Sequence, residues 1–265
     1  MADRAIGIFD SGVGGLTVFR EIAQQLPNEE YLYLGDTGRV PYGTKSPSTV
    51  LRYAQEAAQF LVNHQVKMIV VACNTASAVA LTDLEERFRL PVIGVIEPGA
   101  RKAVAVTRNR KVGVIGTEGT IKSNAYTRAI HAIDPQINVF AAACPLFVPL
   151  VEEGWTEHPV TKLTAEEYLT PLLEHDIDTL VLGCTHYPLL KPTLRAILGE
   201  KVTLVDSAAE TAKSVQEILH RDGLLRQSTA APPRFFVTDL PYRFERVGGS
   251  FLGGLLTNVQ QVEIG

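Results

Sequence analysis

Short continuous apolar runs alternate with segments of helical periodicity along most of the chain. The runs are rich in Val, Ile and Leu and are bounded by Gly, Asp or Asn, which is typical of strands buried on both faces of a parallel sheet. The pattern predicts strands over 5–9, 31–34, 68–72, 92–96, 111–115, 139–142, 180–182, 202–205, 235–238 and 259–263. It predicts helices over 16–25, 48–62, 76–88, 164–175 and 208–221, another from about Ser123, and a short one between the last two strands.

The pattern restarts near residue 111, which indicates an internal duplication. Gly-Ile-Phe-Asp-Ser-Gly (7–12) parallels Gly-Val-Ile-Gly-Thr-Glu (113–118), and Cys73 and Cys184 are separated by a similar number of residues. We therefore predict an α/β fold of two similar lobes, each with a parallel-type sheet flanked by helices. The lobes are expected to be related by a pseudo-two-fold axis, with the active site in the cleft between them. The predicted first lobe comprises residues 1–97 plus 208–265, and the second comprises residues 98–207.

Composition narrows the class of protein further. The 265 residues are 46% hydrophobic and 20% charged, with a formal net charge of −4 and no basic run, which disfavours nucleic acid as a partner. The first residues lack the basic and apolar regions of a leader, and no apolar stretch is long enough to span a bilayer. Three cysteines are too few for a disulfide framework and predict a reducing cytoplasm.

Cys73 and Cys184 occupy near-identical settings. Each follows a Val- or Leu-rich run and a small residue, and each precedes a stretch that can begin a helix, whose dipole would favour a thiolate. Cys144 lacks this setting and is read as a core residue. A redox disulfide has no Cys-x-x-Cys to support it, and a zinc site would need Cys73, Cys184 and His186 to converge. A thiol/thiolate acid–base pair needs only two thiols on opposite sides of a substrate, and we favour it.

Glycine-rich turns follow the first strand of each predicted lobe, at 10–15 and 116–120. Their spacing differs from the dinucleotide-binding Gly-x-Gly-x-x-Gly, so backbone N–H groups that hold a small anion such as a carboxylate fit better. Asp10 is as consistent with a helix cap as with a functional role. His186 is a candidate second acid/base or a group that tunes Cys184, and Glu152 is a weaker candidate because loop carboxylates are usually solvated.

Taken in order, these segments resemble the glutamate racemase family of the cofactor-independent aspartate/glutamate racemase superfamily. Each motif is modest alone, and their order along nearly the whole chain makes the resemblance specific. The motifs are Phe-Asp-Ser-Gly-Val-Gly-Gly-Leu (9–16), Gly-Asp-Thr-Gly-Arg-Val-Pro-Tyr-Gly (35–43), Ala-Cys-Asn-Thr-Ala-Ser (72–77), Val-Ile-Glu-Pro-Gly-Ala (95–100), Gly-Val-Ile-Gly-Thr-Glu-Gly-Thr (113–120), Cys-Pro-Leu-Phe-Val-Pro-Leu-Val-Glu-Glu-Gly (144–154) and Leu-Gly-Cys-Thr-His-Tyr-Pro-Leu-Leu (182–190).

The resemblance implies a racemase that interconverts L-glutamate and D-glutamate at the α-carbon without cofactor or metal, and that supplies D-glutamate for peptidoglycan synthesis. It implies that Cys73 takes the α-proton of D-glutamate and Cys184 that of L-glutamate. Asp10 would assist Cys73, and His186 with Glu152 would assist Cys184. The implied substrate-binding residues are Asp10, Ser11, Pro41, Tyr42, Gly43, Asn74, Thr75, Thr117, Thr120, Thr185 and His186.

The resemblance also bears on partners and on competing functions. It implies a cytoplasmic homodimer whose small-molecule partner is glutamate, with no membrane partner. Some relatives are activated by a peptidoglycan precursor and some inhibit DNA gyrase, and no residue in this chain selects either. A single-thiol decarboxylase of the superfamily is disfavoured by the second cysteine. A non-catalytic binding protein for acidic amino acids and a zinc hydrolase remain the alternatives from other classes.

Overall fold

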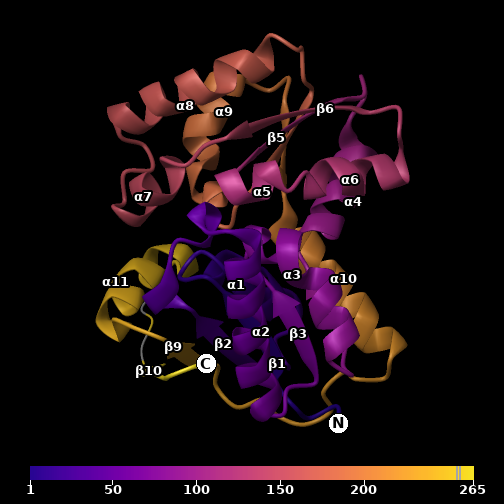
Figure 1. Cartoon of the computed structure of the whole chain (residues 1–265), viewed down its shortest axis with the longest axis vertical. Helices are drawn as coiled ribbons and strands as arrows, with labels where there is room; N and C mark the ends of the chain where they lie inside the picture. Colours follow the sequence, from indigo (N-terminus) through magenta and orange to yellow (C-terminus); the bar gives the residue numbers. More distant parts are fainter. Residues whose placement is uncertain (255, 257) are drawn as a thin grey trace.

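Two parallel β-sheets, each flanked by helices, make up two lobes (Figure 1). The computed structural model describes residues 1–254, 256 and 258–265. The arrangement confirms the predicted α/β class. The sheet of the first lobe has the order β10-β9-β2-β1-β3-β4. Its strands are β1 (Ile6–Asp10), β2 (Tyr31–Gly35), β3 (Met68–Val71), β4 (Val92–Gly94), β9 (Arg234–Val237) and β10 (Val259–Gln261).

The sheet of the second lobe repeats part of this topology. Its order is β6-β5-β7-β8, the same sequence of neighbours as β2-β1-β3-β4 in the first lobe, and all pairs in both sheets are parallel. The third strand along the chain in each set therefore lies beside the first, so the residues that follow β3 and β7 occupy equivalent places. The strands are β5 (Lys111–Gly116), β6 (Asn138–Ala143), β7 (Thr179–Gly183) and β8 (Thr203–Asp206).

Helices cover both faces of each sheet, which is why the strands read as continuous apolar runs. In the first lobe α2 (Pro47–Asn63) and α3 (Asn74–Arg87) cover one face, and α1 (Leu16–Gln25), α10 (Ser207–Arg221) and α11 (Pro241–Leu252) cover the other. In the second, α4 (Ile96–Val106) and α6 (Ala125–Ile133) lie opposite α7 (Phe147–Glu152), α8 (Pro159–Leu173) and α9 (Lys191–Leu198). The short elements are α5 (Glu118–Lys122), η1 (Thr37–Arg39), η2 (Tyr42–Thr44) and η3 (Tyr187–Leu190).

The chain passes between the two sheets twice. The first passage leads from β4 through α4 to β5, and the second leads from β8 through α10 to β9. Helix α4 packs on α6 and β7, whereas α10 packs mainly on α1, and the two passage helices also touch each other. The residues at which one lobe gives way to the other stay a prediction, since both passages are helices shared by the two halves.

The structure corrects several predicted elements. The strand predicted over 92–96 ends at Gly94, and Ile96 begins α4. The strand and the start of the helix form one apolar run here, so hydrophobicity does not mark the boundary between them. The helix predicted from about Ser123 begins at Ala125, after Asn124 with a φ of 55°. The helix predicted from Thr164 begins at Pro159. The pattern also misses α5, α7 and α9.

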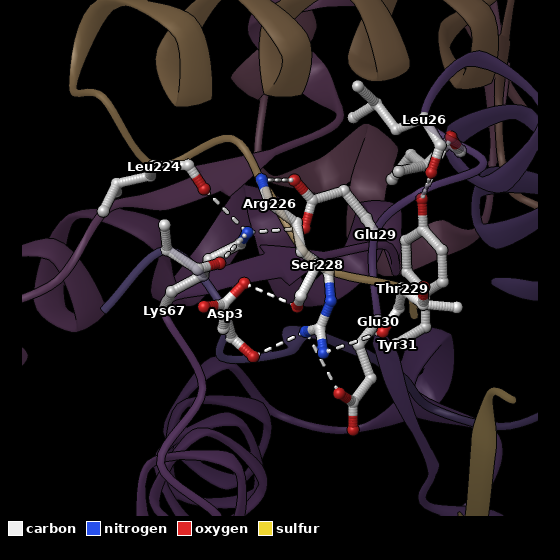
Figure 2. A network of polar contacts seen from close by, with 12 residues as sticks. Asp3, Leu26, Glu29, Glu30, Tyr31, Lys67, Leu224, Arg226, Ser228 and Thr229 are labelled. Carbon is white, nitrogen blue, oxygen red and sulfur yellow. Dashed lines mark hydrogen bonds and ion pairs between the residues drawn. The ribbon is translucent and has the colours of Figure 1, made fainter. Parts of the chain in front are cut away.

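A buried polar network ties the segment after α10 to the first lobe (Figure 2). The Lys67 side chain is fully buried and pairs with Glu29, and its Nζ also donates to the carbonyl oxygens of Ala2 and Leu224, each at 2.7 Å. The backbone N–H of Arg226 donates to Oε1 of Glu29 at 2.9 Å. A buried ammonium group needs such a set of acceptors, and the network lies where β3 begins, at the far end of the strand from Cys73.

No helix among the described residues is long and apolar enough to cross a membrane.

Candidate active site

The two cysteines lie at equivalent strand ends. Cys73 follows β3 and is the N-cap residue of α3, where its Sγ accepts the N–H of Ala76 at 3.5 Å and lies 3.7 Å from Oγ of Ser11. Cys184 follows β7. Both side chains belong to residues that are only 6% exposed, and both thiols are free. The duplicated topology thus places one thiol at the same edge of each sheet.

One cavity brings the two thiols together. It has a volume of about 50 Å³ and lies between the carboxyl ends of the strands of both lobes. Among the residues that the sequence predicts for the site, Asp10 and Thr120 do not line it directly, and Gly12, Val40 and Val148 line it without having been predicted as site residues. The other lining residues are Ser11, Pro41, Tyr42, Gly43, Cys73, Asn74, Thr75, Thr117, Glu152, Cys184, Thr185 and His186.

Asp10 lies just behind the cavity wall and is almost fully buried. Its Oδ1 accepts the N–H of Gly12 at 2.9 Å, whereas Oδ2 has no hydrogen-bond partner among the described residues. Burial raises the pKa of the Asp10 carboxyl, against the lowering effect of His186 and of nearby backbone N–H groups. The N-cap residue of α1 is Gly15, so Asp10 is not the helix cap that the sequence left open.

The environment of Cys73 opposes the expected effect of the helix dipole. Burial, and next the charge of Asp10, raise the pKa of the Cys73 thiol to about 12, although the Ala76 N–H and Ser11 hydroxyl act in the opposite direction. Cys73 does lie at a helix start as expected, but burial and Asp10 outweigh the groups that favour its thiolate. This environment favours the protonated form of the Cys73 thiol.

Cys184 has a different set of neighbours. It is followed by the short η3 rather than by a long helix, which corrects the predicted symmetry. His186 Nδ1 lies 3.9 Å from Sγ of Cys184, and His186 Nε2 lies 3.1 Å from Oε1 of Glu152. Burial alone would lower the pKa of His186, but the contacts with Cys184 and Glu152 outweigh it and raise this pKa to about 10. A protonated His186 can therefore donate to Sγ of Cys184 at neutral pH.

Polar groups converge on the cavity from both lobes. The hydroxyl oxygens of Thr75 and Thr117 are 2.9 Å apart, and Thr120 lies 3.3 Å and 3.1 Å from them. Asn74 Oδ1 accepts the hydroxyl of Tyr126 at 2.7 Å, while Asn74 Nδ2 is a buried donor without an acceptor among the described residues. An unpaired buried donor is costly, and an anionic ligand in the cavity would satisfy it.

The loop over 36–43 forms one wall and is held from behind. Asp36 is fully buried and accepts from the Tyr42 hydroxyl, from Arg39 Nε at 2.7 Å and from Thr238 Oγ1 at 2.9 Å. These contacts fix the aromatic ring of Tyr42 at the cavity. Gly43 packs so closely on Thr117 that a Cβ there would lie 2.6 Å from the Cβ of Thr117.

The turn after β1 presses directly on the loop that carries Cys184. Thr17 Oγ1 donates to the carbonyl oxygen of Thr185 at 3.1 Å. A Cβ on Gly14 would lie 2.2 Å from Oγ1 of Thr185 and 2.5 Å from Nδ1 of His186. The absence of a side chain at Gly14 is what lets the two lobes approach this closely.

The residues considered for a zinc site form a different arrangement. Among the residues that the structure describes, no group of three or more His, Cys, Asp or Glu side chains is spaced to hold a metal ion. His186 instead directs its two ring nitrogens to Cys184 and Glu152.

Comparison with known proteins identifies the family. The profile of the Asp/Glu/hydantoin racemase family matches residues 6–215, which include Cys73, Cys184 and all the described lining residues of the cavity. The chain belongs to this racemase family. Membership of this family supports an acid–base role for the paired thiols. It disfavours the binding protein and the zinc hydrolase.

Individual racemases of the family match over almost their whole length. The glutamate racemase of Geobacter metallireducens is 60% identical over 262 residues, covering 98% of this chain and 97% of that protein. The crystal structure of glutamate racemase isoform RacE1 from Bacillus anthracis has a TM-score of 0.96 at 44% identity, covering 99% of this chain and 98% of that one. The glutamate racemase of Francisella tularensis, solved in complex with D-glutamate, has a TM-score of 0.94 at 40% identity, with the same coverage.

The raised pKa of His186 leads to a prediction of how the stability of this racemase depends on pH. A folded state that binds a proton more tightly than the unfolded chain loses stability as the pH rises between the two pKa values. The stabilising contribution of His186 is thus complete below pH 6.5 and is lost as the pH approaches 10. We expect the free energy of unfolding of the wild type, relative to that of His186→Asn, to fall across this range in urea titrations. His220→Asn, on an exposed residue at the end of α10, is the control. If the difference in free energy of unfolding between the wild type and His186→Asn stays constant or grows with pH, the pKa of His186 is not raised in the folded state.

Proposed function

We propose that this chain is a glutamate racemase that moves the α-proton of glutamate between two cysteines. The observation that carries the proposal is that Cys73 and Cys184, at equivalent strand ends of two lobes, line one cavity. A binding protein needs no thiol on both sides of its ligand. The naming of full-length relatives as glutamate racemases supports glutamate as the substrate over other amino acids.

In the direction from L- to D-glutamate, Cys184 removes the α-proton and Cys73 donates its own proton to the opposite face of the carbon. In the reverse direction the roles exchange, with Cys73 as base and Cys184 as acid. Before and after each turnover one sulfur carries a proton, the other is a thiolate, and Cα carries one proton, so each direction leaves the enzyme in the form that starts the other. Two bases are required because a single base can return a proton only to the face from which it came.

The second proposed element is charge stabilisation at the α-carbon. Removing a proton next to a carboxylate builds negative charge on a group that is already anionic. Pre-aimed donors in a site without bulk water are the means by which proteins stabilise such charge. Asn74 Nδ2 and the hydroxyl groups of Thr75, Thr117 and Thr120 provide donors on one side. Further groups proposed to hold the carboxylates and the amine are Asp10, Ser11, Pro41, Tyr42, Gly43, Thr185 and His186.

The two thiols are proposed to be tuned by different partners. His186, oriented by Glu152, donates toward Cys184 and stabilises negative charge on its sulfur when it acts as base. Asp10, with its free Oδ2 behind the cavity, assists proton movement at Cys73. The enzyme therefore has one thiol that holds its proton and one that is paired with a cation, which is the asymmetry that a two-base reaction needs at the start of a turnover.

Entry of substrate requires the lobes to part. A volume of about 50 Å³ holds a few water molecules and is too small for an amino acid. The passage helices α4 and α10 are the covalent connections about which the lobes can separate. Closure would then expel water and bring both thiols to the α-carbon. We further propose that the enzyme acts in the cytoplasm as a homodimer and supplies D-glutamate for peptidoglycan synthesis.

Incubation of purified, dialysed protein with L-glutamate in D₂O tests the function. We expect deuterium at the α-carbon and decay of the optical rotation to zero, without added metal or pyridoxal phosphate. NMR and polarimetry measure the two quantities on the same sample, and L-aspartate serves as the substrate control. Binding of glutamate without exchange would favour the binding protein, and loss of activity after chelation, with zinc found by metal analysis, would favour the zinc enzyme.

A further inference from the structure

Helix α11 of the first lobe lies on the same side of the molecule as α7 of the second (Figure 1), and one side-chain contact joins them. The contact is an ion pair in which Nη2 of Arg243 donates to Oε2 of Glu152 at 3.2 Å. Glu152 also lines the cavity that holds both thiols. Arg243 thus reaches from one lobe to a residue that the reaction uses in the other, although no motif in the sequence singles it out.

The two oxygens of Glu152 serve two different cations. Oε1 lies 3.1 Å from Nε2 of His186, and Oε2 lies 3.2 Å from Nη2 of Arg243. His186 Nδ1 in turn lies 3.9 Å from Sγ of Cys184. Four side chains thus form a continuous series from the thiol to the protein surface: Cys184, His186, Glu152 and Arg243. Arg243, which is about half-exposed, is its outer member and the one supplied by the first lobe.

The surroundings strengthen this ion pair relative to one on an open surface. Beside it lies a cavity of about 160 Å³, and Glu152 and Arg243 are the charged residues among its described lining. The Glu152 side chain is 24% exposed, so its carboxylate is mostly removed from water. Exposed ion pairs contribute little, whereas charge-assisted hydrogen bonds to a largely buried carboxylate contribute more. Most of the remaining wall is apolar, from Val13, Val40, Leu240, Phe244 and Val247, and Gly12 and Thr37 complete it.

We propose that Arg243 is a positioning residue for the proposed racemase reaction: it holds the Glu152 carboxylate so that His186 stays directed at Cys184. The proposal rests on the proposed function, because it concerns the thiol that acts there as one of two bases. Arg243 makes this contact only while the lobes are together, so the series is complete only in the closed enzyme. Closure of the lobes and orientation of His186 toward Cys184 are thereby linked through the Arg243 side chain.

The electrostatic setting of Glu152 supplies a readout beyond activity. Burial acts to raise the pKa of Glu152, and the contacts with His186 and Arg243 reverse this and lower it. Other charged or titratable groups that face the series are Asp10 from β1, which interacts with His186, and Cys184 itself. Loss of the Arg243 charge therefore raises the pH at which Glu152 gains a proton, and the acidic limb of the pH profile of kcat/KM should move to higher pH.

The test compares Arg243→Ala, Arg243→Lys, Glu152→Gln and the double variant Arg243→Ala/Glu152→Gln with the wild type. Arg243→Ala is expected to lower kcat/KM about fivefold to tenfold. Because the two enantiomers have equal free energy, the decrease must be equal in both directions, which checks each data set internally. Arg243→Lys should restore part of the activity, since its ammonium can reach one oxygen. In the Glu152→Gln background, removal of Arg243 should have no further effect.

Arg246→Ala, an exposed arginine one turn further along α11, is the matched control and should leave kcat/KM and its pH profile unchanged. Wild-type activity of Arg243→Ala, or an undiminished effect of Arg243→Ala in the Glu152→Gln background, overturns the proposal. If neither the wild type nor Arg246→Ala racemises glutamate, the proposed function itself fails. The two failures are thus distinguished in one set of assays.

Discussion

Replacement of either Cys73 or Cys184 with alanine is expected to abolish measurable racemisation, lowering kcat/KM by about 10²–10⁴-fold or more. Each thiol serves as acid in one direction and as base in the other, so neither direction survives the loss of one. Because both are buried against the same cavity, water has little access to replace the missing group. Polarimetry in both directions measures the loss, and circular dichroism verifies that the variants remain folded.

Cys144→Ala provides the matched control for this pair. Cys144 is as fully buried as the other two cysteines, but it belongs to the core of the second lobe and does not line the cavity. We expect this variant to lose some stability and to keep its activity. A single variant at Cys73 or Cys184 that racemises at the wild-type rate would rule out the two-base mechanism.

The second large effect is expected from Gly14→Ala, a change of one methyl group outside the set of proposed catalytic residues. The added Cβ would overlap Thr185 and His186, so the Cys184 loop and the turn after β1 must move apart. A displacement of about 1 Å in an active site can cost about 10²-fold in rate. We expect a loss of that order in kcat/KM, with the free energy of unfolding lowered by only about 1–3 kcal/mol.

The control for Gly14→Ala is Gly254→Ala, where a Cβ would meet none of the described atoms within 4 Å. Steady-state kinetics and urea unfolding on both variants separate the two effects. Activity of Gly14→Ala within twofold of the wild type would show that the lobes can part slightly without cost, and that the tight contact at this turn is not what orients the Cys184 loop.

The inner strands β1, β2, β3 and β7 were predicted well because they are buried on both faces, so that each reads as an unbroken apolar run. A continuous apolar run also prevented prediction of the start of α4 at Ile96, because the end of β4 and the start of the helix belong to one run. Helix α7 escaped the pattern because its six residues, Phe147–Glu152, are too few for a period to emerge. Local periodicity thus predicts long elements, but it does not indicate the boundary where one buried element leads directly into another.

Motifs at strand ends predicted residues that the structure brings together, whereas contacts between the lobes left no signal in the sequence. The segments around Cys73 and Cys184 carry their own sequence signals, and the structure brings them to one cavity. The contact between Arg243 and Glu152 joins residues far apart in the chain, and no local pattern encodes it. The net pKa of Cys73 could not be predicted from the sequence for a related reason. A helix start is visible in sequence, whereas burial and the proximity of Asp10 are properties of the folded chain.

The network around Lys67 has a consequence for the order in which the chain can be completed during synthesis. A ribosome delivers β1 to β4 first, then the entire second lobe, and β9 and β10 last. Until then β2 has no neighbour on its outer side, and Lys67 lacks the acceptor at Leu224 and Glu29 lacks the donor at Arg226 (Figure 2). The first lobe to emerge is therefore the last to be finished. While the second lobe is synthesised, the nascent chain has an unpaired sheet edge at β2 and a Lys67 that lacks part of its hydrogen-bond partners.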